Sequence, residues 1–231
     1  MSSSVSDSGI RTFQARGGRM SKGSREGLTR LWPTYGIGLQ DTPLDFGEIH
    51  DLEGVTPPSN VILEVGFGMG HATTEMAQAD PNSLILAVDV HSAGISALMR
   101  MCEREGITNV RVIQADAVKV IENMIPTDSL SGFRLYFPDP WPKARHQKRR
   151  FVRPDLTELV TTRLRTGGTF HAATDWQDYA DQMLEVLEAT PGLKNQYDGF
   201  APRPKWRPMT AFERRGLKRG HNISDLIFVK E

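Results

Sequence analysis

Cysteine is almost absent from this chain of 231 residues, which contains Cys102 alone. A single cysteine excludes an internal disulfide and any metal site built from several thiolates. Long hydrophobic runs are missing too, because no apolar stretch reaches the roughly 18 residues that a membrane-spanning helix requires. The Ser-rich residues 1–9 lack the apolar centre of a secretory signal. These absences favour a soluble, cytoplasmic protein without a membrane anchor.

Net charge is absent as well, since 28 Lys and Arg balance 28 Asp and Glu, but the charges are segregated along the chain. Residues 41–140 hold 5 basic and 15 acidic side chains. Residues 1–31 hold 6 basic against 2 acidic, residues 141–165 hold 8 against 2, and residues 203–219 hold 7 against 1. Scattered in space, the three basic segments would be ordinary solvated surface. Gathered on one face, they would bind a polyanion.

The length suits a single α/β domain, residues 26–231, preceded by a basic arm at residues 1–25 that we expect to be mobile. Short apolar runs alternate with segments of helical periodicity, which predicts a doubly wound, mostly parallel sheet with helices on both faces. The expected strands are residues 61–65, 84–89, 110–115, 133–137, 169–173 and 226–229. The expected helices are residues 70–79, 92–105, 154–165, 176–189 and 210–219, with a short one after residue 116.

Three glycines, Gly66, Gly68 and Gly70, follow the first expected strand and precede a helix. Glycines permit a tight turn and a close approach of ligand to backbone, and the helix directs unpaired N–H groups at that ligand. A dinucleotide fingerprint would read G-x-G-x-x-G, but the third glycine comes one residue early and Glu64 precedes the loop. A carboxylate repels a pyrophosphate and attracts an ammonium, so the loop favours a cationic nucleoside such as S-adenosylmethionine. A tight turn without a ligand is the alternative.

Each of the first four expected strands ends in or near a carboxylate, namely Glu64, Asp89, Asp116 and Asp139. Ligands of such sheets bind beyond the carboxyl ends of the strands. Asp89 follows Gly70 by 19 residues, close to the spacing at which an acid accepts hydrogen bonds from ribose hydroxyls. A carboxylate at this position also disfavours the 2′-phosphate of NADP. Asp116 could accept a hydrogen bond from an adenine amino group, cap the following helix, or do both. The four acids together indicate an adenosyl ligand.

Three prolines between Pro138 and Pro142 predict a rigid, non-helical exit from the fourth strand, which would hold Asp139 and Trp141 at the mouth of the pocket. Lys143 and a basic run come directly afterwards. The run comprises Arg145, His146, Gln147, Lys148, Arg149 and Arg150. Cations beside the mouth of a cofactor pocket are what contact with a phosphate backbone requires.

Five motifs in combination resemble one family. They are Glu-Val-Gly-Phe-Gly-Met-Gly at 64–70, Pro-Asp-Pro-Trp-Pro-Lys at 138–143, Lys-Arg-Arg-Phe at 148–151, Thr-Asp-Trp at 174–176 and Thr-x-Phe-Glu-x-x-Gly at 210–216. Over residues 25–231 the chain is similar to bacterial tRNA (guanine-N7-)-methyltransferases. The resemblance implies a Rossmann-like class I methyltransferase fold with a seven-stranded sheet. It also implies methyl transfer from S-adenosylmethionine to N7 of guanine 46 in the variable loop of tRNA, by a monomer or homodimer without an obligatory protein partner.

The resemblance assigns roles to individual residues. The S-adenosylmethionine contacts would be the three glycines with Glu64, Asp89, Asp116 and Asp139, and Asp139 would also be the active-site acid. The substrate contacts would be Lys143, Asp175, Thr210, Ala211, Phe212 and Glu213, and residues 145–150 would contact RNA. The family more often has Glu at position 89, but either carboxylate can accept from ribose hydroxyls. Residues 1–24 match no motif of the family.

The expected chemistry is simple. Guanine N7 carries a lone pair and no proton, so its methylation requires no general base and catalysis is mostly positioning. A fixed carboxylate, Asp139 or Asp175, could accept from guanine N1–H and the 2-amino group and favour the developing cation. The unstacked base could rest on an aromatic ring such as that of Trp141. No two of the six histidines pair at ligand spacing, so we expect no metal.

Other functions are less well supported. A class I methyltransferase could act on another RNA or on a small molecule, although the basic segments argue against the latter. An NAD-dependent dehydrogenase would need G-x-G-x-x-G and a partner for hydride transfer, and the sequence offers neither. A non-catalytic RNA-binding protein could use an inactive methyltransferase fold, but every carboxylate and the Pro-Asp-Pro-Trp-Pro-Lys motif are retained. Measured cofactor binding would separate this last alternative from an enzyme.

Overall fold

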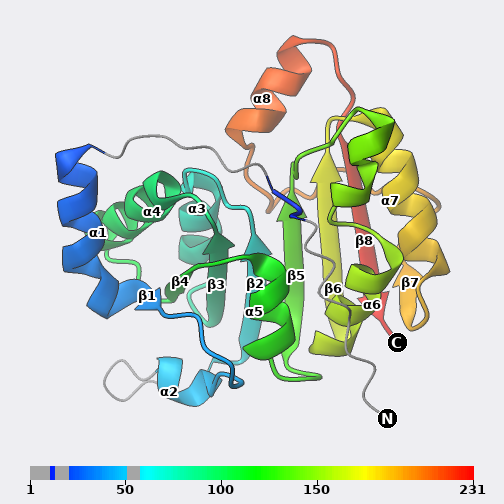
Figure 1. The fold of residues 1–231 in the computed structure, drawn as a ribbon. Helices are drawn as coiled ribbons and strands as arrows, with labels where there is room; N and C mark the ends of the chain where they lie inside the picture. Colours follow the sequence, from blue (N-terminus) through cyan, green and yellow to red (C-terminus); the bar gives the residue numbers. More distant parts are fainter. Residues whose placement is uncertain (1–10, 14–20, 51–57) are drawn as a thin grey trace.

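Eight strands form one sheet in the computed structural model, which describes residues 11–13, 21–50 and 58–231 (Figure 1). Their order is β1-β4-β3-β2-β5-β6-β8-β7. The strands are β1 (Gly36–Ile37), β2 (Asn60–Val65), β3 (Ser83–Asp89), β4 (Val110–Gln114), β5 (Leu130–Tyr136), β6 (Leu164–Thr174), β7 (Leu193–Asn195) and β8 (Ser224–Lys230). Strand β8 is antiparallel to β6 and β7, and the other pairings are parallel.

The mostly parallel sheet confirms the predicted architecture, but the expected number of seven strands was wrong. The two edge strands, β1 and β7, have 2 and 3 residues and were not predicted. Segments this short carry no alternation of apolar and polar residues, so sequence periodicity cannot reveal them. Both lie at the margins of the sheet, and neither changes the arrangement of its centre.

Helices cover both faces of the sheet (Figure 1). They are α1 (Lys22–Tyr35), α2 (Phe46–His50), α3 (His71–Ala79), α4 (Ser92–Glu105), α5 (Ala117–Asn123), α6 (Pro154–Arg163), α7 (Gln177–Ala189) and α8 (Ala211–Lys218), with a 3-10 helix η1 (Ala144–Arg149). Helices α1, α3 and α4 lie on one face and α5, α6 and α7 on the other, whereas α8 stands beyond the carboxyl ends of the parallel strands. Within the described ranges, no helix has the length and apolar character needed to cross a membrane.

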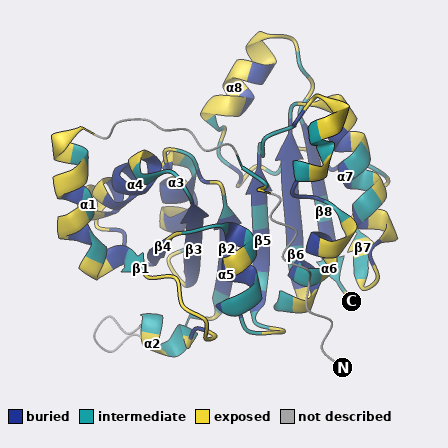
Figure 2. Ribbon diagram, viewed as in Figure 1, coloured by how far each residue is buried: buried dark blue, intermediate teal, exposed yellow. Residues whose placement is uncertain are grey.

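Two apolar clusters, one on each face, hold the layers together (Figure 2). One cluster joins Phe133 and Phe170 of the central strands to the buried sides of α5, α6 and α7, and these two rings lie 4.8 Å apart between centroids. The other joins Ile85 to Leu98 and the buried sides of α1, α3 and α4. Each fully buried side chain of this size contributes about 1.5–3 kcal/mol. The central strands are therefore apolar on both faces, as their sequences predicted.

Helix α1 was not among the helices expected from the sequence. The helix continues through Trp32 and Pro33 to Tyr35 and packs on α4. Gly36 follows because a Cβ at that position would lie 2.2 Å from the Trp32 ring. Helix α1 begins at Lys22, so the expected arm boundary at residue 25 falls inside it. The arm residues 1–10 and 14–20 lie outside the described part of the chain.

The chain reverses its winding direction at β2, and this reversal determines where a ligand can bind. Strand β2 pairs with β3 on one side and β5 on the other, with Val65 level with both Val88 and Leu135. In open α/β sheets, ligands bind beyond the carboxyl ends of the strands at such a switch point. The glycine loop after β2 lies there, between the exits of β3 and β5.

Gly94 sets how closely α4 approaches the glycine loop. A Cβ at Gly94 would lie 2.0 Å from the carbonyl oxygen of Gly68, which is a backbone atom and cannot rotate away. A glycine inside a helix costs about 1 kcal/mol relative to alanine, so this close approach explains why it is present. Sequence patterns did not identify Gly94. A helical glycine without a capping role was the available signal.

Replacing Gly94→Ala should lower the unfolding free energy by about 1–3 kcal/mol, because the added methyl group must displace the loop or the helix. Gly23→Ala is the matched control, since nothing lies within 4 Å of a Cβ at that position in α1. The control should be neutral or stabilising by up to about 1 kcal/mol. Urea unfolding measures both, and equal stability of the two variants would contradict the close approach.

Candidate active site

The glycine loop has a backbone conformation that requires glycine. The φ angles of Gly66, Gly68 and Gly70 are 77°, 63° and 84°, in the left-handed region that side chains disfavour. Asp89, at the end of β3, accepts hydrogen bonds from the backbone N–H of Gly68 at 3.3 Å and of His91 at 2.9 Å. The Asp89 carboxylate therefore fixes the loop against the neighbouring strand exit, in addition to facing the cavity.

Glu64 is a buried carboxylate with unused hydrogen-bonding capacity. Its side chain is 3% exposed, and among the described residues no donor reaches its Oε2 atom. Burial raises the pKa of Glu64, and the charge of Arg134 only partly opposes this effect. A buried acceptor without a partner is costly, so a cationic or hydrogen-bond-donating ligand would stabilise it. Glu64 also lines the larger of the two cavities described next.

Two cavities of about 190 and 470 Å³ lie at the switch point and share walls at Gly66, Gly68, Asp89 and Phe137. The smaller is also lined by Asp139, and the larger by Glu64, Gly70, Thr210 and Ala211. Phe212 of α8 lines both and is 44% exposed. The shared walls make them two parts of one depression between the strand exits and α8.

Asp116 has a helix-capping role in the structure. Its side chain accepts from the backbone N–H of Val118 at 3.0 Å and caps α5. The adjoining wall of the smaller cavity is formed by its neighbours Ala115 and Ala117. Of the two roles that the sequence left open for Asp116, the cap is therefore observed, and an adenine contact remains a prediction.

The exit from β5 is held in an unusual backbone conformation. Phe137 and Trp141 have φ angles of 53° and 45°, which non-glycine residues adopt at a cost. Such a conformation persists only when the surrounding structure holds it. Here the three prolines hold it, together with a hydrogen bond from Arg150 Nε to the Pro140 carbonyl at 2.9 Å. The predicted non-helical exit is confirmed, and Asp139 lines the smaller cavity.

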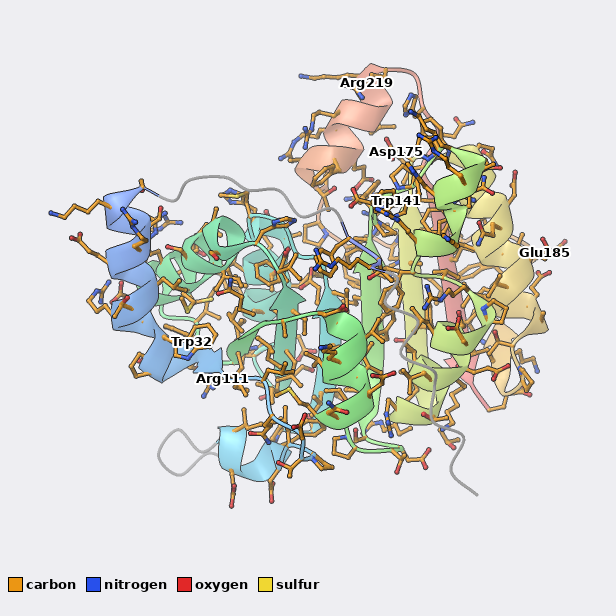
Figure 3. All side chains as sticks on the ribbon, in the orientation of Figure 1. Trp32, Arg111, Trp141, Asp175, Glu185 and Arg219 are labelled. Carbon is orange, nitrogen blue, oxygen red and sulfur yellow. The ribbon has the colours of Figure 1, made fainter. Side chains whose placement is uncertain are left out.

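Trp141 does not offer an open ring face, contrary to the expectation that a base could rest on it. The side chain is 6% exposed, and the guanidinium of Arg149 covers its ring at 4.9 Å. Its Nε1 donates to the backbone carbonyl of Thr12 at 3.4 Å. Figure 3 shows Trp141 and Asp175 at the same end of the sheet as α8. Phe212 is the exposed aromatic residue of the cavity wall.

The basic run folds into η1 at the cavity mouth, and its residues differ in exposure. Lys143, Arg145 and Lys148 are exposed. Slight desolvation and the charges of Arg145 and nearby cations lower the pKa of His146, which reduces its positive charge. Arg150 is 1% exposed and pairs with Asp178 and Gln182 of α7. The prediction that Arg150 belongs to a surface contact with RNA therefore needs correction, because its guanidinium holds the strand exit from inside.

Apart from Lys143, which precedes η1, the predicted substrate residues lie on or against α8. Thr210 caps this helix by accepting from the Glu213 N–H at 3.0 Å. Glu213 is 1% exposed and pairs with Arg207 at 2.7 Å and Arg203 at 2.8 Å. Asp175, directly after β6, accepts from His221 Nδ1 at 3.2 Å, and a Cβ at Gly216 would lie 2.8 Å from Asp175 Oδ2, so a larger residue there would displace this carboxylate. Thr210, Ala211 and Phe212 therefore line the depression, whereas Asp175 and Glu213 line neither cavity and Glu213 is buried.

A buried polar chain links the sheet to this helix. Tyr136 OH is 3.0 Å from His171 Nδ1, and His171 Nε2 is 2.7 Å from Asp225 Oδ1, which Arg207 also contacts. Burial lowers the pKa of His171, although Asp225 opposes the shift. Neutral His171 therefore accepts from Tyr136 and donates to Asp225. Sequence analysis missed His171 and Arg207, because nothing in their local pattern indicates buried partners more than 15 residues away.

Protein stability should fall as pH is lowered from about 7.5 to 5.5. The unfolded chain binds a proton at this histidine near its ordinary pKa of about 6.5, whereas folded His171, with a lowered pKa, does not. His171→Gln keeps a donor and an acceptor but cannot titrate, so its stability should fall less steeply. Urea unfolding at several pH values measures the slopes, with exposed His71→Gln as the control. Equal slopes for the wild type and His171→Gln would contradict a neutral buried histidine.

Comparison with known proteins gives evidence for the family of this chain that is independent of the geometry of the site. The family described as "Putative methyltransferase" matches residues 58–226. A tRNA (guanine-N(7)-)-methyltransferase of Streptomyces avermitilis is 49% identical over 95% of this chain and 74% of its own length. The enzyme of the same name from Paraburkholderia xenovorans is 47% identical over 96% of this chain and 83% of its own length.

Solved structures confirm the fold at low sequence identity. The 16S rRNA methyltransferase KamB aligns with a TM-score of 0.54 at 18% identity, over 96% of this chain and 99% of that one. An rRNA methylase from Streptococcus thermophilus aligns with a TM-score of 0.50 at 13% identity, over 94% and 99%. These likenesses show the Rossmann-like class I methyltransferase fold. With the sequence identities above, they establish that the chain belongs to the tRNA (guanine-N(7)-)-methyltransferase family.

Proposed function

We propose that this protein transfers a methyl group from S-adenosylmethionine to N7 of a guanine in tRNA. The observation that carries the proposal is the buried Glu64 carboxylate, whose Oε2 has no hydrogen-bond partner among the described residues, beside a glycine loop in the left-handed conformation. A cationic ligand that also presents an amino acid ammonium fits this acceptor, whereas a pyrophosphate does not. The guanine that we propose is the one at position 46 of the variable loop, and the family relationship supports that choice.

The cofactor would lie along the carboxyl ends of β2, β3 and β4. Glu64 would accept from its ammonium group, Asp89 from its ribose hydroxyls and Asp116 from its adenine amino group. The backbone of Gly66, Gly68 and Gly70 would approach it closely, because no side chain intervenes there. When bound, S-adenosylmethionine supplies a methyl group on a sulfonium, which the N7 lone pair of guanine can accept without any proton transfer.

The task left to the protein is therefore to position the base and to stabilise its new positive charge. Asp139 lines the smaller cavity at the rigid strand exit and is the proposed active-site acid. Its carboxylate would accept from guanine N1–H and the 2-amino group, and Asp175 is the second candidate for this contact. Phe212, which is exposed and lines both cavities, is the aromatic residue on which the unstacked base would rest. Thr210 and Ala211 would complete the substrate side, and buried Glu213 would support them from within the fold.

The tRNA backbone would cross the mouth of the depression between η1 and α8. On one side, Lys143, Arg145, Lys148 and Arg149 carry positive charge, accompanied by His146 and Gln147. On the other side, the exposed residues Arg214 and Arg215 line the larger cavity. Phosphate contacts from these cations would give affinity and register without reading the base sequence.

The direct test is incubation of the pure protein with methyl-labelled S-adenosylmethionine and unmodified tRNA, followed by analysis of the nucleosides. Label should appear in 7-methylguanosine. Asp139→Asn, which keeps the side-chain volume, should lower turnover by about 100-fold or more while tRNA affinity changes little. Label in another nucleoside would overturn the base specificity, and a fully active Asp139→Asn would overturn the role of Asp139.

Neutralising three cations of η1 should weaken tRNA binding and reduce its dependence on salt. The variant Arg145→Gln with Lys148→Gln and Arg149→Gln removes up to three phosphate contacts, and each lost contact lowers the slope of log K against log salt by about 0.7–0.9. The matched control makes the same charge change away from the mouth, at Arg104 in the last turn of α4, at Arg165 and at Lys194. If the two variants show the same salt dependence, η1 does not contact the phosphates.

A further inference from the structure

Arg207 is one of the largest fully buried side chains of the described chain, with an exposed fraction of 0%. Its guanidinium lies between two carboxylates. Nε and Nη2 each donate to Asp225 at 2.8 Å, and Nη1 and Nη2 donate to Glu213 at 2.7 and 3.2 Å. Only the planar fork of arginine can contact two carboxylates in this paired geometry, because a lysine ammonium is a point charge.

The two carboxylates belong to different parts of the fold. Asp225 lies on β8, and His171 of β6 also contacts it. Glu213 lies in the first turn of α8, where Arg203 also pairs with it. Arg207 therefore joins the rigid sheet to a helix that otherwise stands beyond the sheet with most of its residues exposed (Figure 2).

The guanidinium also supports the opposite wall of the cavity. It lies 5.7 Å from the ring centroid of Tyr136 and 5.9 Å from that of Phe137. Phe137 has a positive φ angle and leads directly into Pro138 and Asp139. Since a strained residue is held only by its surroundings, the packing of Arg207 on this ring contributes to the position of the active-site acid.

We propose that Arg207 is a positioning residue for methyl transfer, which sets the spacing between the strand exit that carries Asp139 and the helix that carries Phe212. Both walls line the same depression, and Arg207 contacts the structural support of each. It acts through these neighbours and is itself buried away from any substrate. This inference rests on the proposed methyl transfer.

The test compares Arg207→Lys with the wild type. Lysine keeps the charge but not the fork, so we expect kcat to fall at least tenfold while the KM for tRNA changes less than threefold, because a small misplacement across the cavity is enough to slow the reaction. Amide hydrogen exchange of the free protein should rise in residues 211–218 and stay unchanged in α4. This second readout does not depend on catalysis, so it remains informative if the proposed function fails.

Arg163→Lys is the matched control. Arg163 is half-buried, and it donates to the carbonyls of Ile121 and Glu122 next to the amino end of β6, away from the cavity. The Arg163→Lys variant should lower the stability of the protein without changing kcat or the amide hydrogen exchange of α8. Wild-type turnover in Arg207→Lys, or equal losses of turnover in both variants, would overturn the proposal.

Glu213→Gln covers the case in which Arg207→Lys fails to fold. This variant leaves Asp225 paired with Arg207 and weakens only the connection to α8. It should reproduce the loss of kcat and the faster exchange of α8, and adding Arg207→Lys should cause little further loss. If Glu213→Gln instead raises the KM for tRNA and leaves kcat and exchange unchanged, Glu213 contacts the substrate directly and the positioning role of Arg207 is wrong.

Discussion

Two buried guanidinium groups hold the exit of β5, and the geometry of the site depends on them. Arg150 and Arg207 are among the largest side chains that the described structure buries completely. Arg150 donates to the Pro140 carbonyl and pairs with Asp178 of α7, whereas Arg207 packs on Phe137 and pairs with Glu213 of α8. A buried charge is tolerated only when it is fully paired. The pairing requirement therefore fixes α7, α8 and the proline-rich exit relative to one another.

This arrangement explains how one depression can serve a cationic cofactor and an anionic RNA. Carboxylates gather at the strand ends inside the depression, where no described residue donates to Glu64 Oε2 and Asp89 already holds the glycine loop. Exposed cations gather at its rim on η1 and α8. The zero net charge of the chain conceals this separation. Because N7 methylation needs no proton transfer, a rigid wall that positions the base is the main requirement, and the strained backbone at Phe137 and Trp141 fits that requirement.

The sequence predicted the parts of the fold that local patterns determine. The central strands, the glycine loop and the rigid exit follow from apolar runs, glycine spacing and proline. The edge strands β1 and β7 were missed because they are too short for any periodicity. Burial of charged residues was missed for a different reason. The side-chain partners of Arg150 lie 28–32 residues away, and those of Arg207 lie on α8 and β8, so only the tertiary structure reveals that these arginines face inward.

The central claim is that the N7 lone pair of guanine receives the methyl group and that the protein positions it without a general base. The most direct measurement uses a tRNA transcript in which the target guanosine is replaced by 7-deazaguanosine, which keeps the Watson–Crick edge but has carbon in place of N7. The account predicts that this transcript binds with about the affinity of the unmodified one and accepts no methyl group. Methyl transfer to the 7-deaza transcript at an undiminished rate would contradict it, because another atom would then be the acceptor.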